Sequence, residues 1–279
     1  MITNAIRERV LLNDGNQIPQ LGLGVWRAND GEETYQAVRW ALEAGYRSID
    51  TASLYANEAS VGKAFHDSGL SREEVFITTK VWNPDQGYDK TLAAFEKSLK
   101  LLDLEYVDMY LAHYPVTGKY LDTWKALERL QEEKLVRSIG VSNFHIHHLE
   151  TLLAHANVKP VVNQIELHPY LSQKDLIEYH KEFDILTEAW APIAKGRVLG
   201  EDIIVELSKK YGKTPAQVVL RWELQQGIII IPKSVHQERI QENCNIYNFA
   251  LTEEEMKRID TLECDGRIGT DPDKMIYDD

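Results

Sequence analysis

Residues 21–27 read Leu-Gly-Leu-Gly-Val-Trp-Arg, a short apolar run that ends at Val25. In an open, doubly wound α/β sheet, the first strand should lead into a G-x-G-x-x-G phosphate loop. Gly22 and Gly24 fit that pattern, but Arg27 stands where the third glycine should be. We therefore reject the doubly wound sheet and look for another α/β fold.

Seven more β-rich runs follow the first, and segments with helical periodicity separate them. The eight runs are 21–25, 46–49, 75–79, 107–112, 136–141, 161–165, 185–189 and 228–231. They start roughly every 24–32 residues, which is the length of one βα unit. The last interval is longer because two helices, near 200–211 and 215–226, fit into it.

Eight βα repeats in 279 residues predict a closed (β/α)₈ TIM barrel. Helices are expected over 32–44, 120–130 and 214–225, the last with Thr214 as N-cap and Pro215 at the first helical position. Residues 10–12 and 17–19 flank turn residues 13–16, so an N-terminal β-hairpin should close the bottom of the barrel. No linker is recognisable, and we expect one domain over residues 1–279.

The composition excludes several classes of function. The net charge of −13, without any basic run, argues against nucleic-acid binding. No apolar stretch is long enough to span a bilayer, and residues 1–4 do not begin a signal peptide. Cys244 and Cys264 form no CxxC pattern, which favours a reducing, cytoplasmic setting. We take a monomer as the default.

In such a barrel, polar residues at the carboxyl ends of the strands converge on one mouth. Asp50 ends the second run, and Tyr55 follows in its loop. Lys80 ends the third run and His113 the fourth. Taken alone, each has an ordinary explanation as a turn or packing residue. Their joint placement at successive strand ends is better explained by a catalytic site.

These four side chains suit the reduction of a carbonyl group. A phenol with its usual pKa near 10 is a poor proton donor at pH 7, so we expect the Lys80 ammonium to lower the pKa of Tyr55. Asp50 would keep Lys80 charged and in place. His113 would donate a hydrogen bond that orients the carbonyl oxygen, and Tyr55 would supply the proton when the carbon accepts a hydride.

The other strand ends suggest the source of the hydride. Ser142, Asn143 and Gln164 offer donors and acceptors for a nicotinamide carboxamide, and Trp190 offers a flat face for the ring. The segment 231–239 contains Lys233, Ser234, Val235 and Arg239. Within it, Ser234 and Gln237 form a capping-box pattern that predicts a helix start. With Lys233 and Arg239 this would be an anion site suited to the ribose 2′-phosphate of NADPH.

Four histidines lie close together in the sequence: His145, His147, His148 and His155. They form no H-E-x-x-H pattern and have no obvious carboxylate partner, so we predict no metal site. A metal-dependent barrel hydrolase would need ligands at several strand ends, where only Asp50 and His113 qualify.

Two long motifs stand out in the chain. One is Gly45-Tyr46-Arg47-Ser48-Ile49-Asp50-Thr51-Ala52 with Glu58 and Val61-Gly62. The other is Ile231-Pro232-Lys233-Ser234 with Arg239-Ile240 and Glu242-Asn243. In these motifs the chain resembles the aldo-keto reductases, and the resemblance extends from about residue 10 to about residue 275. Within the family the chain is similar to the bacterial 2,5-diketo-D-gluconate reductase group, and residues 267–273 resemble the tail of that group.

The resemblance implies a (β/α)₈ barrel that binds NADPH and a catalytic tetrad of Asp50, Tyr55, Lys80 and His113. It places Glu242 and Asn243 near the adenine, and Lys233, Ser234 and Arg239 near the 2′-phosphate. Position 114 is Tyr where many members have Trp. Because the tail after Leu262 is short, we expect an open pocket lined by Trp26, Trp82 and Tyr114, which favours small carbonyls.

The expected function is therefore NADPH-dependent reduction of aldehydes and small ketones. The alternative from another class is an NADPH-binding redox sensor with little turnover, since the family includes such subunits. An intact tetrad favours the enzyme. The sequence does not identify the substrate.

Overall fold

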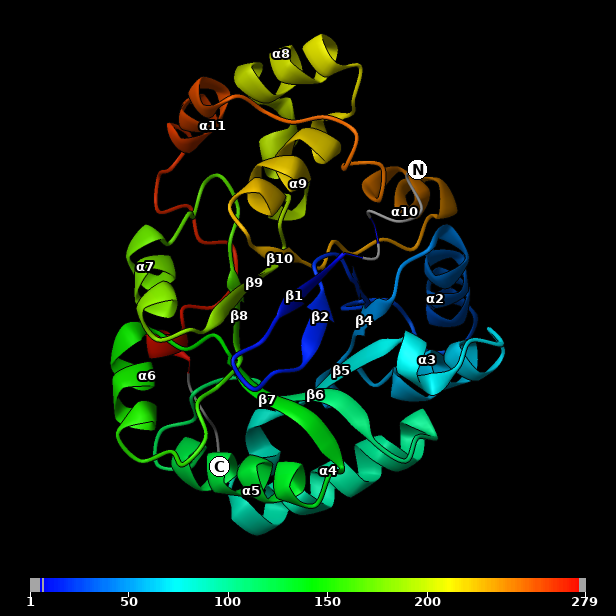
Figure 1. Ribbon diagram of the computed structural model, residues 1–279, viewed down its shortest axis with the longest axis vertical. Helices are drawn as coiled ribbons and strands as arrows, with labels where there is room; N and C mark the ends of the chain where they lie inside the picture. Colours follow the sequence, from blue (N-terminus) through cyan, green and yellow to red (C-terminus); the bar gives the residue numbers. More distant parts are fainter. Residues whose placement is uncertain (1–5, 7, 276–279) are drawn as a thin grey trace.

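Eight parallel strands form the centre of the protein, and each of them overlaps one of the predicted runs. The computed structural model describes residue 6 and residues 8–275. The strands are β3 (Leu23–Gly24), β4 (Ser48–Asp50), β5 (Phe76–Val81), β6 (Val107–Ala112), β7 (Val136–Ser142), β8 (Val162–Glu166), β9 (Leu186–Trp190) and β10 (Ile229–Ile230). Each strand pairs with the next in chain order. Helices surround this sheet (Figure 1), so the fold is the predicted (β/α)₈ barrel.

The two glycines of the opening stretch lie at the seam where the barrel closes. Leu21 bridges Ile230, Gly24 bridges Lys233, and the Gly22 N–H donates to the Ile230 carbonyl at 2.9 Å. A Cβ at Gly24 would lie 2.8 Å from the Ile231 carbonyl oxygen, closer than packing allows. A glycine at position 24 is thus required because the chain after β10 packs directly against β3. Gly24 therefore has a structural role that does not involve a phosphate-binding loop.

The helices lie outside the strands. They are α2 (Glu32–Ala44), α3 (Glu58–His66), α4 (Tyr88–Leu102), α5 (Tyr120–Glu132), α6 (Ile146–Leu153), α7 (Lys174–Glu182), α8 (Asp202–Tyr211), α9 (Pro215–Gln225), α10 (Gln237–Asn243) and α11 (Glu253–Asp260). The predicted Thr214 cap of α9 is confirmed. A Cβ at Gly62 of α3 would lie 2.1 Å from the Leu102 carbonyl oxygen, so Gly62 lets α3 pack closely against the end of α4.

A two-stranded hairpin covers one end of the barrel, as predicted (Figure 1). It consists of β1 (Arg9–Leu11) and β2 (Gln17–Pro19), paired antiparallel with Val10 opposite Ile18. Ile18 is fully buried in an apolar cluster with Met109, Leu111 and Ile229 from the barrel strands. The hairpin therefore closes the amino-terminal end of the barrel and leaves the carboxyl end for the site.

Two expectations concern a membrane-spanning segment and a signal peptide. Within residue 6 and residues 8–275, no helix has the length and apolar character needed to cross a bilayer. Residues 1–4, from which we inferred the absence of a signal peptide, lie outside the described residues.

Candidate active site

A buried ion pair lies at the carboxyl ends of two adjacent strands. Lys80 of β5 and Asp50 of β4 are 0% and 2% exposed, and Lys80 Nζ donates to Asp50 Oδ1 at 2.6 Å. Lys80 Nζ also donates to the Thr51 carbonyl at 3.0 Å. Burial disfavours the ammonium, but the Asp50 carboxylate, with Tyr55 and Glu188, raises the pKa of Lys80 above its ordinary value. Lys80 is therefore charged at neutral pH.

Tyr55 reaches this pair from the loop after β4. The short helix η1 (Ser53–Tyr55) is followed by its C-cap Ala56, whose φ of 54° lies in the left-handed region. Ser53 Oγ fastens the loop by donating to the Lys80 carbonyl at 2.9 Å and accepting from the Trp82 N–H at 3.2 Å. Lys80 Nζ then donates to the Tyr55 hydroxyl at 3.4 Å. One ammonium thus contacts both the carboxylate and the phenol.

The predicted lowering of the Tyr55 pKa is wrong for the chain described here. Burial is the largest influence and raises the pKa of Tyr55; the Lys80 ammonium opposes it, and nearby Asp50 adds to the increase. Desolvation of the phenolate outweighs a single hydrogen bond from an ammonium. Tyr55 therefore keeps its proton at neutral pH, the state that a proton donor needs.

His113 follows β6 and is 6% exposed. Its ring contacts Tyr55 edge to face, with 5.8 Å between the ring centroids. Burial, with a contribution from the Lys80 ammonium, holds the pKa of His113 well below its ordinary value, so the imidazole is neutral. Nδ1 of His113 has no hydrogen-bond partner among the residues that the structure describes. The four residues predicted to form a catalytic site therefore come together.

Side-chain hydrogen bonds join three of the four residues assigned to the nicotinamide: Ser142, Asn143 and Trp190. Trp190 Nε1 donates to Asn143 Oδ1 at 2.9 Å, and Asn143 Nδ2 donates to Ser142 Oγ at 3.1 Å. Asn143 has a φ of 62°, a left-handed conformation that asparagine tolerates. Because Asn143 holds the edge of the half-buried indole, the ring of Trp190 has a fixed orientation.

Gln164 links the ion pair to a second buried carboxyl that sequence reasoning missed. Gln164 Nε2 donates to Asp50 Oδ2 and to Glu188 Oε2, each at 2.8 Å. Glu188 is 1% exposed, and burial together with the neighbouring Asp50 carboxylate raises its pKa to about 8. Glu188 lies two residues before Trp190 in β9, so the alternation of side chains along a strand places both on one face. That alternation in the sequence could have predicted that Glu188 points to the same side of the strand as Trp190.

Replacing Glu188 by Gln should change how stability depends on pH. Between the ordinary glutamate pKa of 4.5 and about 8, the folded chain keeps a proton that the unfolded chain releases. The free energy of unfolding should therefore fall as pH rises, by about 1.4 kcal/mol per unit from this residue. Glu188→Gln removes that slope. In urea unfolding at pH 5, 6.5 and 8, the free energy of unfolding of the variant should increase relative to that of wild type toward pH 8.

The same pH dependence in wild type and Glu188→Gln would contradict a protonated Glu188 in the folded chain.

The residues assigned to the 2′-phosphate and the adenine lie after β10 and on α10. Lys233 and Arg239 are exposed, Ser234 is 7% exposed, Val235 and Glu242 are half-buried, and Asn243 is buried. The predicted capping box of Ser234 and Gln237 is wrong. Gln237 begins the helix and His236 is the N-cap, while Ser234 Oγ accepts from the His236 N–H at 3.1 Å. Ser234 thus supports the turn before the helix.

The structure places the expected pocket residues in two groups. Trp82 contacts both His113 and Tyr114, with ring centroids 5.0 and 6.2 Å apart. The Trp26 ring instead has the Arg27 guanidinium at 4.4 Å and the Lys195 ammonium at 5.1 Å from its centroid. Aromatic rings therefore line the mouth beside His113 and near the β3 and β9 loops.

The short C-terminal tail reaches the mouth of the barrel. The Ile268 and Gly269 N–H groups donate to the Glu166 carboxylate at 2.6 and 2.8 Å. A Cβ at Gly269 would lie 2.3 Å from Trp190 Cη2, so only glycine fits against that indole. Asn83 Nδ2, next to Trp82, contacts Met275 Sδ at 3.5 Å. The tail therefore extends from Trp190 to the loop that carries Trp82.

The chain is similar to known proteins over nearly its whole length. Residues 20–263 match the model of the aldo/keto reductase family. The chain is 57% identical over 270 residues to the 9,11-endoperoxide prostaglandin H2 reductase of Trypanosoma cruzi, covering 96% of this chain and 95% of that protein. It is 49% identical to the glyoxal reductase of Bacillus subtilis, with 98% and 99% covered. The crystal structure of a Gox0644 mutant in complex with NADPH superposes with a TM-score of 0.93 at 46% identity, covering 97% and 99%.

Proposed function

The chain belongs to the aldo/keto reductase family, and on that premise we propose that it reduces aldehydes and small ketones to alcohols with NADPH as the reductant. The observation that carries the proposal is the position of Lys80 Nζ, 2.6 Å from Asp50 and 3.4 Å from the Tyr55 hydroxyl, beside a neutral His113. This arrangement brings a proton donor and hydrogen-bond donors to one point in the mouth of the barrel.

Each of the four residues has a role that its surroundings support. Tyr55 holds the proton that passes to the carbonyl oxygen, and its raised pKa keeps the phenol protonated until then. Lys80 stabilises the phenolate that remains, and Asp50 keeps Lys80 positioned and charged. His113 hydrogen-bonds the carbonyl oxygen and orients it. NADPH, when bound, supplies the hydride that the carbonyl carbon accepts.

The residues present fit a nicotinamide cofactor. Asn143 fixes the edge of Trp190, so the indole face is what remains for stacking the nicotinamide ring. We assign its carboxamide to Ser142, Asn143 and Gln164. Lys233, Ser234, Val235 and Arg239 would hold the 2′-phosphate, since the two cations are exposed and suited to a phosphate dianion. Glu242 and Asn243 would contact the adenine.

We propose small carbonyl compounds, including glyoxal-like dicarbonyls, as the substrate class. Trp82 and Tyr114 line the mouth beside His113, Trp26 lies near the β3 and β9 loops, and the tail borders the mouth where it contacts Asn83. A relative at 49% identity is named glyoxal reductase, which supports the same class. We further propose that one domain spanning the chain acts as a cytoplasmic monomer that binds no nucleic acid.

The test is to follow the absorbance of NADPH while glyoxal, methylglyoxal, an aromatic aldehyde and 2,5-diketo-D-gluconate are added in turn. We expect NADPH oxidation with the small dicarbonyls, at rates above those for the aromatic aldehyde. Absence of oxidation with every compound, while NADPH still binds by fluorescence titration, would contradict the enzyme and support a redox sensor.

Arg239→Ala should weaken NADPH far more than NADH. A guanidinium paired with a phosphate contributes about 1.5–3 kcal/mol, which corresponds to about a 10- to 150-fold loss of NADPH affinity. NADH lacks the 2′-phosphate, so its affinity should change little. Fluorescence titration of both cofactors checks this, with the exposed Arg137 of β7 as control: Arg137→Ala should leave both affinities unchanged. Equal losses for NADPH and NADH in Arg239→Ala would refute the 2′-phosphate assignment.

A further inference from the structure

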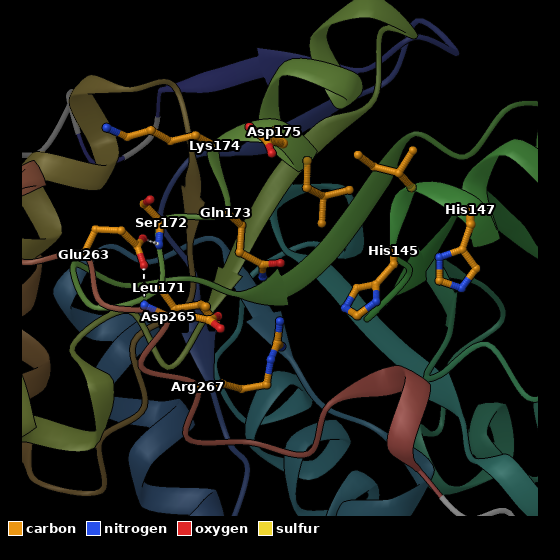
Figure 2. Close-up of a pocket in the computed structure, with 12 residues that line it drawn as sticks. His145, His147, Leu171, Ser172, Gln173, Lys174, Asp175, Glu263, Asp265 and Arg267 are labelled. Atoms are coloured by element: carbon orange, nitrogen blue, oxygen red, sulfur yellow. Dashed lines mark hydrogen bonds between the residues drawn. The ribbon is translucent and has the colours of Figure 1, made fainter.

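Three histidines at the start of α6 meet an aspartate from the C-terminal tail. His145, His147 and His148 lie in and just before the first turn of the helix, and Asp273 lies in η5 (Pro272–Lys274). The ligand atoms of the four residues lie within 4.8 Å of one another. Figure 2 shows His145 and His147 beside each other at the rim of a surface pocket of about 520 Å³. The carboxylate partner that the histidines lacked in the sequence is therefore supplied by Asp273, which lies 125 to 128 residues further along the chain.

The spacing of these atoms suits a shared metal ion. Asp273 Oδ2 lies 3.0 Å from His145 Nδ1, and Asp273 Oδ1 lies 3.1 Å from His147 Nε2. In a tetrahedral site with bonds of about 2.0–2.2 Å, neighbouring ligand atoms lie about 3.3–3.6 Å apart. Both Asp273 contacts are a few tenths of an ångström shorter than this, and all the ligand atoms lie within 4.8 Å of one another, so the three residues face a common point.

His148 has a different role, which its hydrogen bond determines. Its Nδ1 accepts the backbone N–H of His145 at 3.2 Å, so Nδ1 carries no proton and Nε2 does. A protonated nitrogen cannot bind a metal, but it can donate to Asp273 Oδ1, which lies 3.5 Å from Nε2. Hydrogen bonds of this kind orient the ligands of metal sites.

We propose that His145, His147 and Asp273 bind one divalent transition-metal ion, of which Zn²⁺ is the representative, and that His148 orients the Asp273 carboxylate. Two imidazoles and one carboxylate suit Zn²⁺, Ni²⁺ or Cu²⁺, whereas Mg²⁺ and Ca²⁺ prefer oxygen ligands throughout. The side chains of His147 and Asp273 are 59% and 45% exposed, so an ion can enter from solvent and water can complete its coordination.

A bound ion would join α6 to the tail. The same tail contacts Glu166 through Ile268 and Gly269, and Asn83 through Met275. Asp273 lies between these two contacts, so the ion would fasten the segment that borders the mouth. This proposal is independent of the reductase activity, because zinc binding is measured without cofactor or substrate.

The test is zinc binding by the tag-free, chelator-treated chain, measured by competition with a zinc-sensitive dye. Wild type should bind one Zn²⁺ per chain. His147→Gln and Asp273→Asn should each weaken zinc binding by more than about 100-fold. Removing a residue that binds the metal lowers affinity more than removing a residue that only hydrogen-bonds such a ligand. His148→Gln should weaken it by about 10- to 100-fold. Each variant is checked by circular dichroism to show that it folds.

His155 provides the matched control. It follows the same helix, and its Nδ1 contacts the Thr151 carbonyl at 2.8 Å. His155→Gln should bind zinc as wild type does. The proposal is overturned if wild type binds no stoichiometric zinc, if Asp273→Asn binds as tightly as wild type, or if His155→Gln is weakened equally. Equal weakening by His148→Gln and His147→Gln would overturn the orienting role of His148.

Discussion

Tyr55→Phe should lower kcat for carbonyl reduction by about 10²- to 10⁴-fold, the usual contribution of a positioned proton donor. The substitution removes only the hydroxyl that accepts from Lys80 Nζ at 3.4 Å. The ring and its edge-to-face contact with His113 remain, so the shape of the mouth should be preserved. NADPH affinity should change little, because Tyr55 is not assigned to the cofactor.

Steady-state rates with methylglyoxal and fluorescence titration of NADPH check this prediction together. Tyr35→Phe is the matched control, since its hydroxyl bonds Asp67 at 2.9 Å on the outer helices and its loss should leave kcat unchanged. Full turnover by Tyr55→Phe would exclude Tyr55 as the proton donor. A variant that no longer binds NADPH would show that the phenol has a structural role instead.

Lys80→Met should destabilise the fold by about 3–5 kcal/mol, the usual effect of leaving one member of a buried ion pair without its partner. Asp50 is 2% exposed and would lie beside Glu188 with only the Gln164 amide between them. Activity should also fall strongly, because no ammonium would remain next to the Tyr55 hydroxyl. Urea unfolding at pH 7 measures the loss of stability.

A second substitution identifies the cause of that loss, because it removes the charge that Lys80→Met leaves without its partner. The double variant Lys80→Met/Asp50→Asn should recover part of the stability at pH 7. Lys63→Met is the control, since the Lys63–Asp67 pair is exposed to solvent and its loss should change stability little. A double variant that is no more stable than Lys80→Met would indicate a packing effect only.

Much of the fold could be predicted because each βα unit carries its own local signals. The helix over 32–44 has the predicted bounds, and the Thr214 cap and the hairpin turn at 13–16 depend on neighbouring residues alone. The wrong prediction of a capping box at Ser234 also has a local cause. The Ser234 hydroxyl accepts from the His236 N–H in the turn before α10 and not from the helix. A serine followed three residues later by a glutamine is compatible with either arrangement.

The candidate site could be predicted where it depends on strand ends and not where it depends on contacts between distant segments. Asp50 and Lys80 end adjacent strands, so the fold brings them together once the strands are known. The pairing of Asp273 with His145 and His147 joins a tail to a helix over 125 residues or more, and no local pattern signals it. The raised pKa of Tyr55 likewise depends on burial, which the sequence does not give quantitatively.

The central claim is direct hydride transfer to a carbonyl with Tyr55 as the proton donor, and an isotope measurement tests it most directly. Methylglyoxal is reduced by the enzyme with NADPH deuterated at both C4 positions, and the alcohol is analysed by mass spectrometry and NMR. We predict one deuterium on the carbinol carbon for wild type, and at least about 100-fold slower formation of that product with Tyr55→Phe. Alcohol without deuterium, or equal rates for the two proteins, would contradict the account.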